Sequence, residues 1–450
     1  MRPDEPGNDE AIREGQYALV RSAPQPLRLH YASCGNERAP LLLMLHGFPE
    51  GWFAWRESMP RFARRFHVVA PDLRGYGRSD KPEGVDAYRA AELVADLDAL
   101  VDALGYERCA LVGHDWGGAL AWGFAIAHPE RVERLAILNA PHPVPFAEAL
   151  AHDPHQQAAS AYMNWLRRPG AEKVLARDDF ARLDAMLASM GSADWLDAEQ
   201  RAEYHAAWAI PGALEAAVNY YRASPLHPPA ENDRDAALPA LDASRFTVRV
   251  PTLVVWGERD TALLPSLLDG LDRLVPQLRI VRLPEATHWL VHEATQRVAR
   301  EIAAFVDDLA NAIVVRVGHW ERLCADALPL RVAVFVDEQG VPTDIESDGR
   351  DADALHCVAY RDGRAIATGR LLPQAKIGRM AVRADARGQG IGMRVLDALV
   401  ARARARGDAA VELSAQCAAE GFYRRCGFET IGEPYREAGI EHVRMRRVLG

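Results

Sequence analysis

The segment GHDWGG at residues 113–118 constrains the fold more than any other, because it directly follows the apolar run Cys109–Val112. The apolar run is typical of a buried strand, and the residues after the segment have helical periodicity. Glycines on both sides of one polar residue let the chain turn sharply and hold the central side chain above the edge of a sheet. The segment therefore predicts a strand–turn–helix unit that presents Asp115 as a nucleophile.

Short apolar runs alternate with helix-like stretches over the first 140 or so residues. The runs that predict buried strands are Leu41–Leu45, His67–Ala70, Cys109–Val112 and Leu135–Leu138. The stretches that predict helices between them are Ala90–Leu104 and Ala119–His128. This alternation indicates an α/β fold with a parallel sheet and crossover helices.

From about residue 142 to residue 244 the strand signal disappears, and helical periodicity predicts a cap over the sheet. A proline-rich run at 224–241 predicts an extended tether that leads out of the cap. Strands resume at 251–257 and 279–284, and the helix Ala294–Leu309 closes the unit. We expect a first domain over residues 1–311 that includes the cap.

A second set of elements begins near residue 312 with the strand Ala312–Val317 and the helix His319–Leu330. Two further β runs surround Asp362-Gly363, a dipeptide typical of a type I′ hairpin turn. The strand Gly378–Val382 precedes a glycine-rich turn and a long helix at 391–406. These elements predict a separate α+β domain over residues 312–450.

Composition and charge exclude several classes of partner. The net charge is −10, and neither part of the chain has the dominant basic face that nucleic-acid binding needs. The six cysteines form no C-x-x-C pair and no zinc-like spacing, so we expect reduced thiols and no metal. The acidic N-terminus does not resemble a signal peptide, and the longest apolar runs are strand-sized. We expect a cytoplasmic protein without a membrane partner; a homodimer is left open.

Two later residues complete a triad with Asp115 in the order nucleophile, acid, histidine. Asp260 follows the strand at 251–257, and His288 follows the strand at 279–284. An aspartate nucleophile forms an ester with the substrate carbon; the histidine then deprotonates the water that hydrolyses the ester, and the acid orients the histidine. The segment HGFP at 46–49 predicts an oxyanion hole from the backbone N–H groups of Phe48 and Trp116.

Five segments together resemble the epoxide hydrolase branch of the α/β-hydrolases over about residues 15–309. They are HGFPE at 46–50, DLRGYGRSDKP at 72–82, GHDWGG, GERD at 257–260 and THW at 287–289. The resemblance implies two cap tyrosines that bind and protonate the epoxide oxygen, and Tyr162 and Tyr221 match them in AYMNWLRRPGAE and VNYYRASP. A phenol stays protonated at neutral pH, which suits a donor. The implied activity is hydrolysis of a small-molecule epoxide to a vicinal diol without metal or cofactor.

The same motifs also fit haloalkane and fluoroacetate dehalogenases. Two features count against these relatives. Haloalkane dehalogenases often have Asn at the position of Phe48. Fluoroacetate dehalogenases have the pattern D-R-G-G at the nucleophile turn, with Arg at the position of Trp116. The epoxide hydrolase pattern usually has Gly before the catalytic histidine, whereas this chain has Thr287. Because the other motifs are shared, dehalogenation at Asp115 is the alternative to epoxide hydrolysis.

In the second domain, the segment RGQGIG at 387–392 follows the strand IGRMAV at 377–382 and opens a helix. Backbone N–H groups at a helix N-terminus attract a pyrophosphate. Together with FYRRCGF at 422–428, this pattern resembles the GNAT N-acetyltransferases. The segments VFVDEQGVP at 334–342 and SAQCAA at 414–419 are similar to the ElaA-like branch of that family.

This second resemblance implies acetyl-CoA as co-substrate and transfer of an acetyl group to an unknown amine. Tyr423 matches the tyrosine that protonates the departing thiolate, and Glu338 or His356 could be either the base or a structural residue. The alternative is a domain that only binds CoA as a sensor or scaffold. The implied CoA-binding residues are Met380, Ala381, Val382, Arg387, Gly388, Gln389, Gly390, Ile391 and Gly392.

Overall fold

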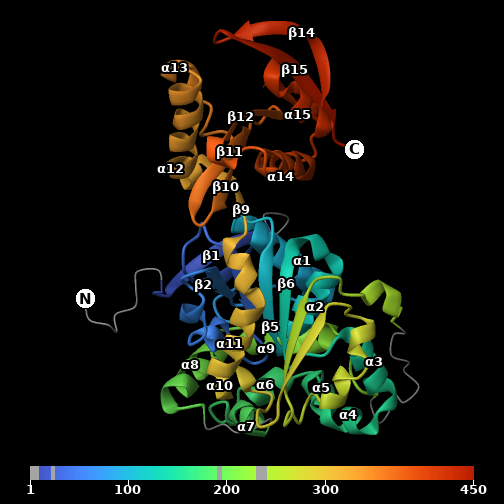
Figure 1. Ribbon diagram of the computed structural model, residues 1–450. Helices are drawn as coiled ribbons and strands as arrows, with labels where there is room; N and C mark the ends of the chain where they lie inside the picture. Colours follow the sequence, from blue (N-terminus) through green and yellow to red (C-terminus); the bar gives the residue numbers. More distant parts are fainter. Residues whose placement is uncertain (1–9, 22–25, 190–194, 230–240) are drawn as a thin grey trace. The chain divides into compact units, whose positions relative to one another are not determined.

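The computed structural model describes residues 10–21, 26–189, 195–229 and 241–450 (Figure 1). The chain divides into two compact units; the first ends at Ala310 and the second begins at Asn311. Most of the predicted tether falls on residues 230–240, which lie outside the described ranges. No helix in these ranges is long and apolar enough to cross a membrane.

The first unit is built on an eight-stranded sheet in the order β1-β2-β4-β3-β5-β6-β7-β8. Its strands are β1 (Arg13–Arg21), β2 (Leu27–Cys34), β3 (Leu41–Leu45), β4 (His67–Pro71), β5 (Cys109–His114), β6 (Val132–Leu138), β7 (Thr252–Gly257) and β8 (Leu278–Leu283). From β4 to β8 all neighbours are parallel, which confirms the predicted α/β class. Strands β3, β4 and β5 are buried along their whole length, as expected when helices cover both faces.

The antiparallel strands β1 and β2 at the edge of this sheet were not predicted. Eight of the nine β1 residues are exposed or half-exposed, so the strand lacks a clear apolar signal.

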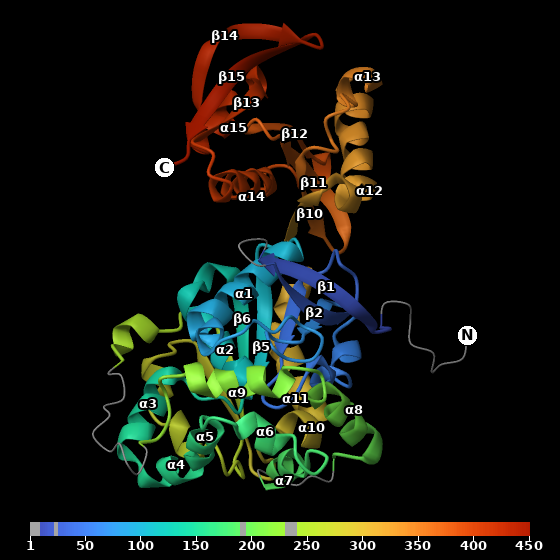
Figure 2. The ribbon, with the colours of Figure 1, turned by 180° about the vertical axis from the view of Figure 1, so that it is seen from behind.

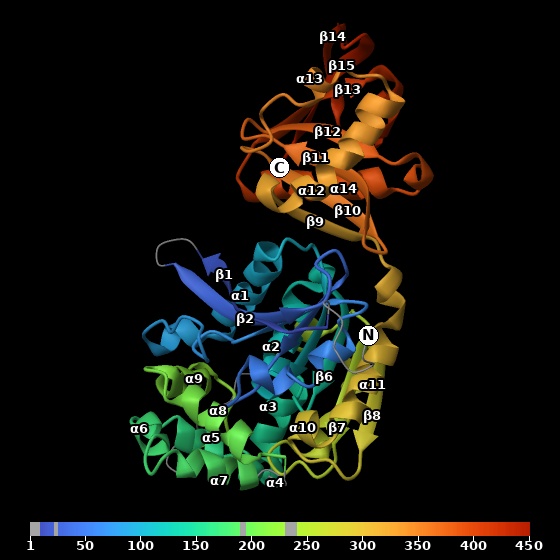
Figure 3. The ribbon, with the colours of Figure 1, turned by 90° about the vertical axis from the view of Figure 1, so that its left-hand side faces the viewer.

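Helices cover both faces of the first sheet (Figures 1 and 3). Helices α1 (Ala90–Ala103) and α2 (Asp115–Ala127) lie on one face, and α11 (Thr295–Val306) lies on the other. Helix α2 begins at Asp115 itself, four residues before the predicted start at Ala119. The predicted nucleophile therefore occupies the first turn of a helix.

Between β6 and β7 the described residues contain helices and no strand. They are α3 (Pro143–His152), α4 (Pro154–Ala159), α5 (Ala161–Leu166), α6 (Ala171–Leu175), α7 (Ala181–Ser189), α8 (Ala198–Trp208) and α9 (Ala213–Ala223). Figures 1 and 2 show these helices together at one end of the sheet, which is the predicted cap. The ring of Tyr221 in α9 contacts the ring of Trp116 in α2, so the cap covers the end of the sheet at which Asp115 lies.

The second unit has a seven-stranded sheet in the order β14-β15-β13-β12-β11-β10-β9. Its strands are β9 (Val314–His319), β10 (Leu355–Arg361), β11 (Arg364–Leu371), β12 (Lys376–Val382), β13 (Ala410–Gln416), β14 (Glu429–Glu437) and β15 (Ile440–Val448). Its helices are α12 (Trp320–Arg331), α13 (Thr343–Glu346), α14 (Ile391–Ala405) and α15 (Glu420–Arg425). Helices α12 and α14 lie on opposite faces of the sheet (Figure 1).

Two local features of this unit matter for its site. Strands β12 and β13 are its parallel neighbours, and they pair only at Lys376–Glu412 and Ile377–Leu413 before they diverge. Between β10 and β11, Asp362 and Gly363 have φ angles of +51° and +72°, which is the type I′ geometry that the sequence predicts.

Candidate active sites

Asp115 occupies a strained turn between β5 and α2, with a φ angle of +49°. This left-handed region is rarely occupied by residues other than glycine, so the surrounding packing must hold it. A Cβ atom at Gly117 would lie 2.3 Å from the Leu45 carbonyl oxygen, and one at Gly113 would lie 2.4 Å from the Gly117 carbonyl oxygen. Glycine is therefore needed at both flanking positions for β5 and α2 to meet at this angle.

The carboxylate of Asp115 lies against the loop that follows β3. The backbone N–H of Phe48 donates a 2.8 Å hydrogen bond to Asp115 Oδ1. A Cβ atom at Gly47 would lie 2.5 Å from the Cβ of Asp115, so this loop approaches the carboxylate only because residue 47 has no side chain. His46 is buried and accepts a 3.0 Å hydrogen bond from the backbone N–H of Leu73, as expected of a structural turn residue.

The three predicted triad residues lie together, although 173 positions separate the first from the last. His288 Nε2 lies 3.5 Å from Asp115 Oδ2, and His288 Nδ1 lies 2.8 Å from Asp260 Oδ2. Asp260 also accepts a hydrogen bond from Asn139 Nδ2 at 2.5 Å. The backbone N–H groups of Ala262 and Leu263 donate hydrogen bonds of 2.8 and 2.9 Å to Asp260 Oδ1.

The charges of this group control one another. Burial alone would raise the pKa of Asp260, but the charge of His288 and the hydrogen bonds outweigh burial and lower it. Burial alone would lower the pKa of His288, but the carboxylates of Asp260 and Asp115 outweigh burial and raise it. Because the carboxylates of Asp115 and Asp260 both lie next to the imidazole of His288, the resting site favours its imidazolium form.

The two predicted cap tyrosines lie above the triad. Tyr162 of α5 and Tyr221 of α9 have ring centroids 6.1 Å apart, and the Tyr221 ring contacts Phe48 at 5.1 Å and Trp116 at 5.2 Å. Burial and the charge of Asp115 raise the pKa of Tyr162. Burial, the neighbouring Tyr162 and the charge of Asp115 raise the pKa of Tyr221 well above its ordinary value. Both hydroxyls therefore remain proton donors at neutral pH.

Sequence reasoning missed a buried carboxylate behind the triad, that of Glu50. It accepts a 2.8 Å hydrogen bond from the Tyr204 hydroxyl of cap helix α8, and it lies 2.7 Å from His292 Nε2 and 3.1 Å from His114 Nδ1. His114 Nε2 lies 2.9 Å from the backbone oxygen of His288. Burial alone would raise the pKa of Glu50, but the bonds to both histidines outweigh it and lower the pKa. The only signal in the sequence was the acidic residue that ends HGFPE.

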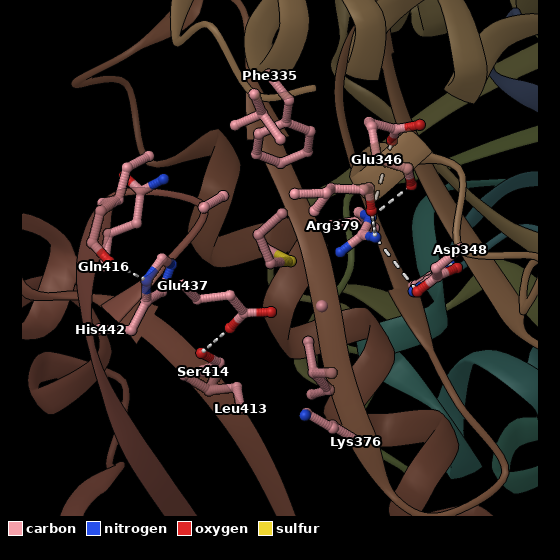
Figure 4. A pocket seen from close by; sticks show the side chains of 18 of the residues that line it. Phe335, Glu346, Asp348, Lys376, Arg379, Leu413, Ser414, Gln416, Glu437 and His442 are labelled. Atoms are coloured by element: carbon pink, nitrogen blue, oxygen red, sulfur yellow. Dashed lines mark hydrogen bonds and ion pairs between the residues drawn. The ribbon is translucent and has the colours of Figure 1, made fainter. Parts of the chain in front are cut away.

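In the second unit, a cavity of about 450 Å³ opens where β12 and β13 diverge (Figure 4). Met380 of β12 and Tyr423 of α15 line it, and burial raises the pKa of Tyr423 to about 12. Met380 alone of the nine predicted CoA-binding residues lines this cavity. The side chain of Ala381 is buried, so only its backbone could meet a ligand.

A bulge in β12 lies beside the cavity. Thr368 pairs with Ala381 and Arg370 pairs with Gly378, so two residues of β12 face the single residue Gly369. Arg379 in the bulge has a φ angle of +52°. A bulge of this kind turns backbone groups away from the strand ladder.

The predicted pyrophosphate loop runs from Arg387 to the start of α14 at Ile391. Gly388 and Gly390 have φ angles of +75° and +76°, and a Cβ atom at either would meet no atom within 4 Å. The loop therefore has open space in front of a helix N-terminus. Arg387 donates two 2.7 Å hydrogen bonds to the carboxylate of Glu338.

Two other residues of the loop, and the base candidate His356, contact other parts of the protein. Gln389 donates to the backbone oxygen of Asp385 at 3.1 Å, and Gly392 lies close to Val382 and Phe422. His356 is buried within β10, and its Nε2 lies 3.0 Å from the Asp351 backbone oxygen. Neither His356 nor Glu338 is among the described residues that line the cavity. In the described ranges no cluster of three or more acidic, His or Cys side chains could hold a metal.

Comparison with known proteins gives matches for both parts of the chain. A family model described as alpha/beta hydrolase fold matches residues 40–295, and one described as an acetyltransferase (GNAT) domain matches residues 324–449. Epoxide hydrolase 4 of Mus musculus is 33% identical over 308 residues, which cover 67% of this chain and 82% of that protein. Epoxide hydrolase 3 of Xenopus tropicalis is 35% identical over 301 residues, which cover 65% of this chain and 78% of that protein. The structure of a Bacillus megaterium epoxide hydrolase in complex with an inhibitor matches with a TM-score of 0.59 and 34% identity, and covers 65% of this chain and 100% of that one.

Proposed function

The chain belongs to the α/β-hydrolase family and carries a GNAT acetyltransferase domain, and on this premise we propose a bifunctional enzyme. The first unit hydrolyses epoxides to vicinal diols, and the second transfers an acetyl group from acetyl-CoA to an amine. For the hydrolase, the observation that carries the proposal is the Asp115 carboxylate 3.5 Å from His288 Nε2 with two protonated tyrosines above it. The six free cysteines support a cytoplasmic location.

In the first step, the hydroxyls of Tyr162 and Tyr221 donate hydrogen bonds to the epoxide oxygen. A carboxylate oxygen of Asp115 attacks one ring carbon, a C–O bond forms, and the C–O bond of the ring breaks. One phenol gives its proton to the developing alkoxide, because the raised pKa of both tyrosines keeps the proton available until that moment. The product is an ester between Asp115 and the opened substrate.

In the second step, His288 becomes the base. Ester formation removes the negative charge of Asp115, which had helped to raise the pKa of His288. The imidazolium then gives up its proton, which restores the phenol, and the neutral ring deprotonates a water. That water attacks the ester carbonyl, whose developing oxyanion accepts hydrogen bonds from the backbone N–H groups of Phe48 and Trp116. The ester C–O bond then breaks, and the carboxyl group of Asp115 gives its proton to the leaving alkoxide. The diol leaves, with Asp115 again a carboxylate and His288 again an imidazolium.

The test is to trap the ester. The variant His288→Gln, incubated with styrene oxide, should gain the mass of one whole epoxide on the peptide that contains Asp115, because the second step lacks its base. The variant Asp115→Ala should gain no mass. A single turnover of the unmodified enzyme in ¹⁸O-labelled water should place the label in the Asp115 carboxylate, because water attacks the ester carbonyl.

Two results would contradict the epoxide proposal. One is the absence of an adduct with several epoxides, together with alkylation of Asp115 by a haloalkane and release of halide, which would establish a dehalogenase. The other is diol formation by Asp115→Ala at the rate of the unmodified enzyme, which would exclude the ester.

For the second unit, the divergence of β12 and β13, the open loop at 387–392 and the buried Tyr423 support acetyl transfer. In this proposal, the loop binds the pyrophosphate of acetyl-CoA, the bulged end of β12 binds its pantetheine arm, and Tyr423 protonates the departing thiolate. The variant Tyr423→Phe should lower kcat and leave the KM for acetyl-CoA unchanged. Binding of CoA without turnover of any amine would instead favour a sensor or scaffold.

A further inference from the structure

The cavity between β12 and β13 has charged side chains on two walls (Figure 4). One wall carries Glu346, Asp348 and Arg379. The other is formed by β13 and the turn between β14 and β15, and it carries Ser414 and Glu437. Figure 4 shows these two groups of side chains on opposite sides of the cavity.

The acidic groups of the first wall are already neutralised. Arg379 lies 3.2 Å from Asp348 and 3.8 Å from Glu346. These groups belong to a network with as many arginines as acids: Arg331, Arg370, Arg379, Glu346, Asp348 and Asp351. Because its charges cancel, this wall offers little net attraction to a charged ligand.

Lys376 and Glu437, which carry opposite charges, line the cavity and have no ion-pair partner among the described residues. The contact that Glu437 makes is a 3.3 Å hydrogen bond from the Ser414 hydroxyl. Figure 4 shows the amine of Lys376 directed toward the wall that carries Ser414 and Glu437. Arg350 lines the same cavity and donates to the uncharged Gln374 at 2.9 Å, so it adds a second positive charge to the lining that has no ion-pair partner.

From this arrangement we propose that the acetyl acceptor is a small amine that also carries a carboxylate, as in an α-amino acid. Its ammonium lies at Glu437 and its carboxylate lies at Lys376, so that both unpaired groups gain a partner. An amine without an anion would instead bring a like charge to Lys376, which opposes binding. A cavity of about 450 Å³ that also receives the end of the acetyl thioester has room for a small molecule. The inference rests on the acetyl transfer proposed above.

In the proposed reaction, the acceptor ammonium gives one proton to the Glu437 carboxylate, and the neutral nitrogen attacks the thioester carbonyl. The C–N bond forms and the C–S bond breaks; Tyr423 protonates the thiolate, and the second proton lost by the nitrogen restores Tyr423. One acetylated amine, one CoA thiol and one proton leave.

The first test compares matched acceptors with the whole protein: α-amino acids, their carboxamides, and amines that carry no anion. The readouts are the free CoA thiol and the mass of the N-acetyl product. We expect kcat/KM for an amino acid to exceed that for its amide by about tenfold or more. The variant Lys376→Met should remove this preference by raising KM for the acid and lowering KM for the amide, and Lys376→Arg should restore it.

The second test reads binding without turnover. The chain contains three lysines, Lys81, Lys173 and Lys376, so labelling by an amine-reactive ester can be followed at each by peptide mass. In the presence of CoA, an N-acetyl amino acid should protect Lys376 from the reagent, whereas its amide should not. The exposed Lys173 provides the internal reference.

The outcomes separate the two proposals. Equal acetylation of acids, amides and simple amines would overturn the acceptor assignment and leave acetyl transfer intact. Acetylation of a peptide lysine, with amino acids inert, would overturn it in favour of a protein acceptor. If no amine is acetylated, the proposed acetyl transfer fails; protection of Lys376 by the N-acetyl acid then still supports the carboxylate site, and its absence overturns the site.

Discussion

Loss of the Asp115 charge should turn His288 from an acid into a base. The two groups lie 3.5 Å apart, and at an effective dielectric constant of about 20 this separation corresponds to an attraction of about 5 kcal/mol. Asp115→Asn keeps the shape and removes the charge, as ester formation does. Because about 1.4 kcal/mol changes a pKa by one, this substitution should lower the pKa of His288 by about 3.5.

The assay is an NMR titration of the imidazole signal of His288, identified by its loss in His288→Gln. The raised pKa of His288 also has a linked effect on stability. Its pairing with the carboxylates stabilises the fold fully at pH values below the unfolded-state pKa of about 6.5, and this contribution is lost as pH rises through the folded-state pKa. Asp115→Asn should therefore lower the free energy of unfolding at pH 6 more than at pH 10.

Kinetics should show the same coupling. In the proposed mechanism, formation of the ester uses Asp115 and the tyrosines, whereas its hydrolysis needs neutral His288. In single-turnover experiments the hydrolysis rate should rise with pH around an apparent pKa well below that of His288 in the free enzyme. If Asp115→Asn changes the pKa of His288 by less than about 0.5, or if free enzyme and ester share one pKa, the charge-coupled mechanism is refuted.

Three further predictions concern the same unit. Tyr162→Phe and Tyr221→Phe should each slow ester formation by about 10- to 100-fold and leave ester hydrolysis unchanged in stopped-flow measurements; equal slowing of both steps would contradict their role as acids. Gly117→Ala should cost about 3 kcal/mol or more in thermal unfolding, because its Cβ would overlap a carbonyl oxygen, whereas Gly123→Ala, with a side chain 3.2 Å away, should be close to neutral. Glu50→Gln should cost about 1–3 kcal/mol near pH 7 and less as pH falls through the lowered pKa of Glu50, and a loss that does not depend on pH would exclude this charge as the cause.

Much of the candidate hydrolase site could be predicted because its chemistry lies at the ends of strands. Asp115, Asp260 and His288 each follow an apolar run, and the carboxyl ends of parallel strands meet at one edge of a sheet. A strand of this kind is visible in the sequence, so its last residues can be assigned to that edge. The cap tyrosines were found by resemblance alone, because helical periodicity does not say which face of a cap helix meets the sheet.

Glu50 could not be predicted as the centre of a buried network. Its partners Tyr204, His292 and His114 come from three segments that approach one another only in the folded chain. The same holds for Glu338, a candidate base whose carboxylate is bound to Arg387. Ion pairing depends on distances across the fold, and sequence spacing carries little information about such distances.

The sequence by itself determined the fold class, the order of the two units, the turn that presents the candidate nucleophile and the glycine loops. Each of these depends on short-range backbone geometry and on apolar runs a few residues long. Only the tertiary structure decided which charges are paired. It pairs Arg379 with Glu346 and Asp348, leaves Lys376 and Glu437 without an ion-pair partner among the described residues, and sets His288 between two carboxylates. The physical reason is that burial and Coulomb energy depend on groups that are distant in sequence, and these meet only when the sheets, cap and hairpins have packed.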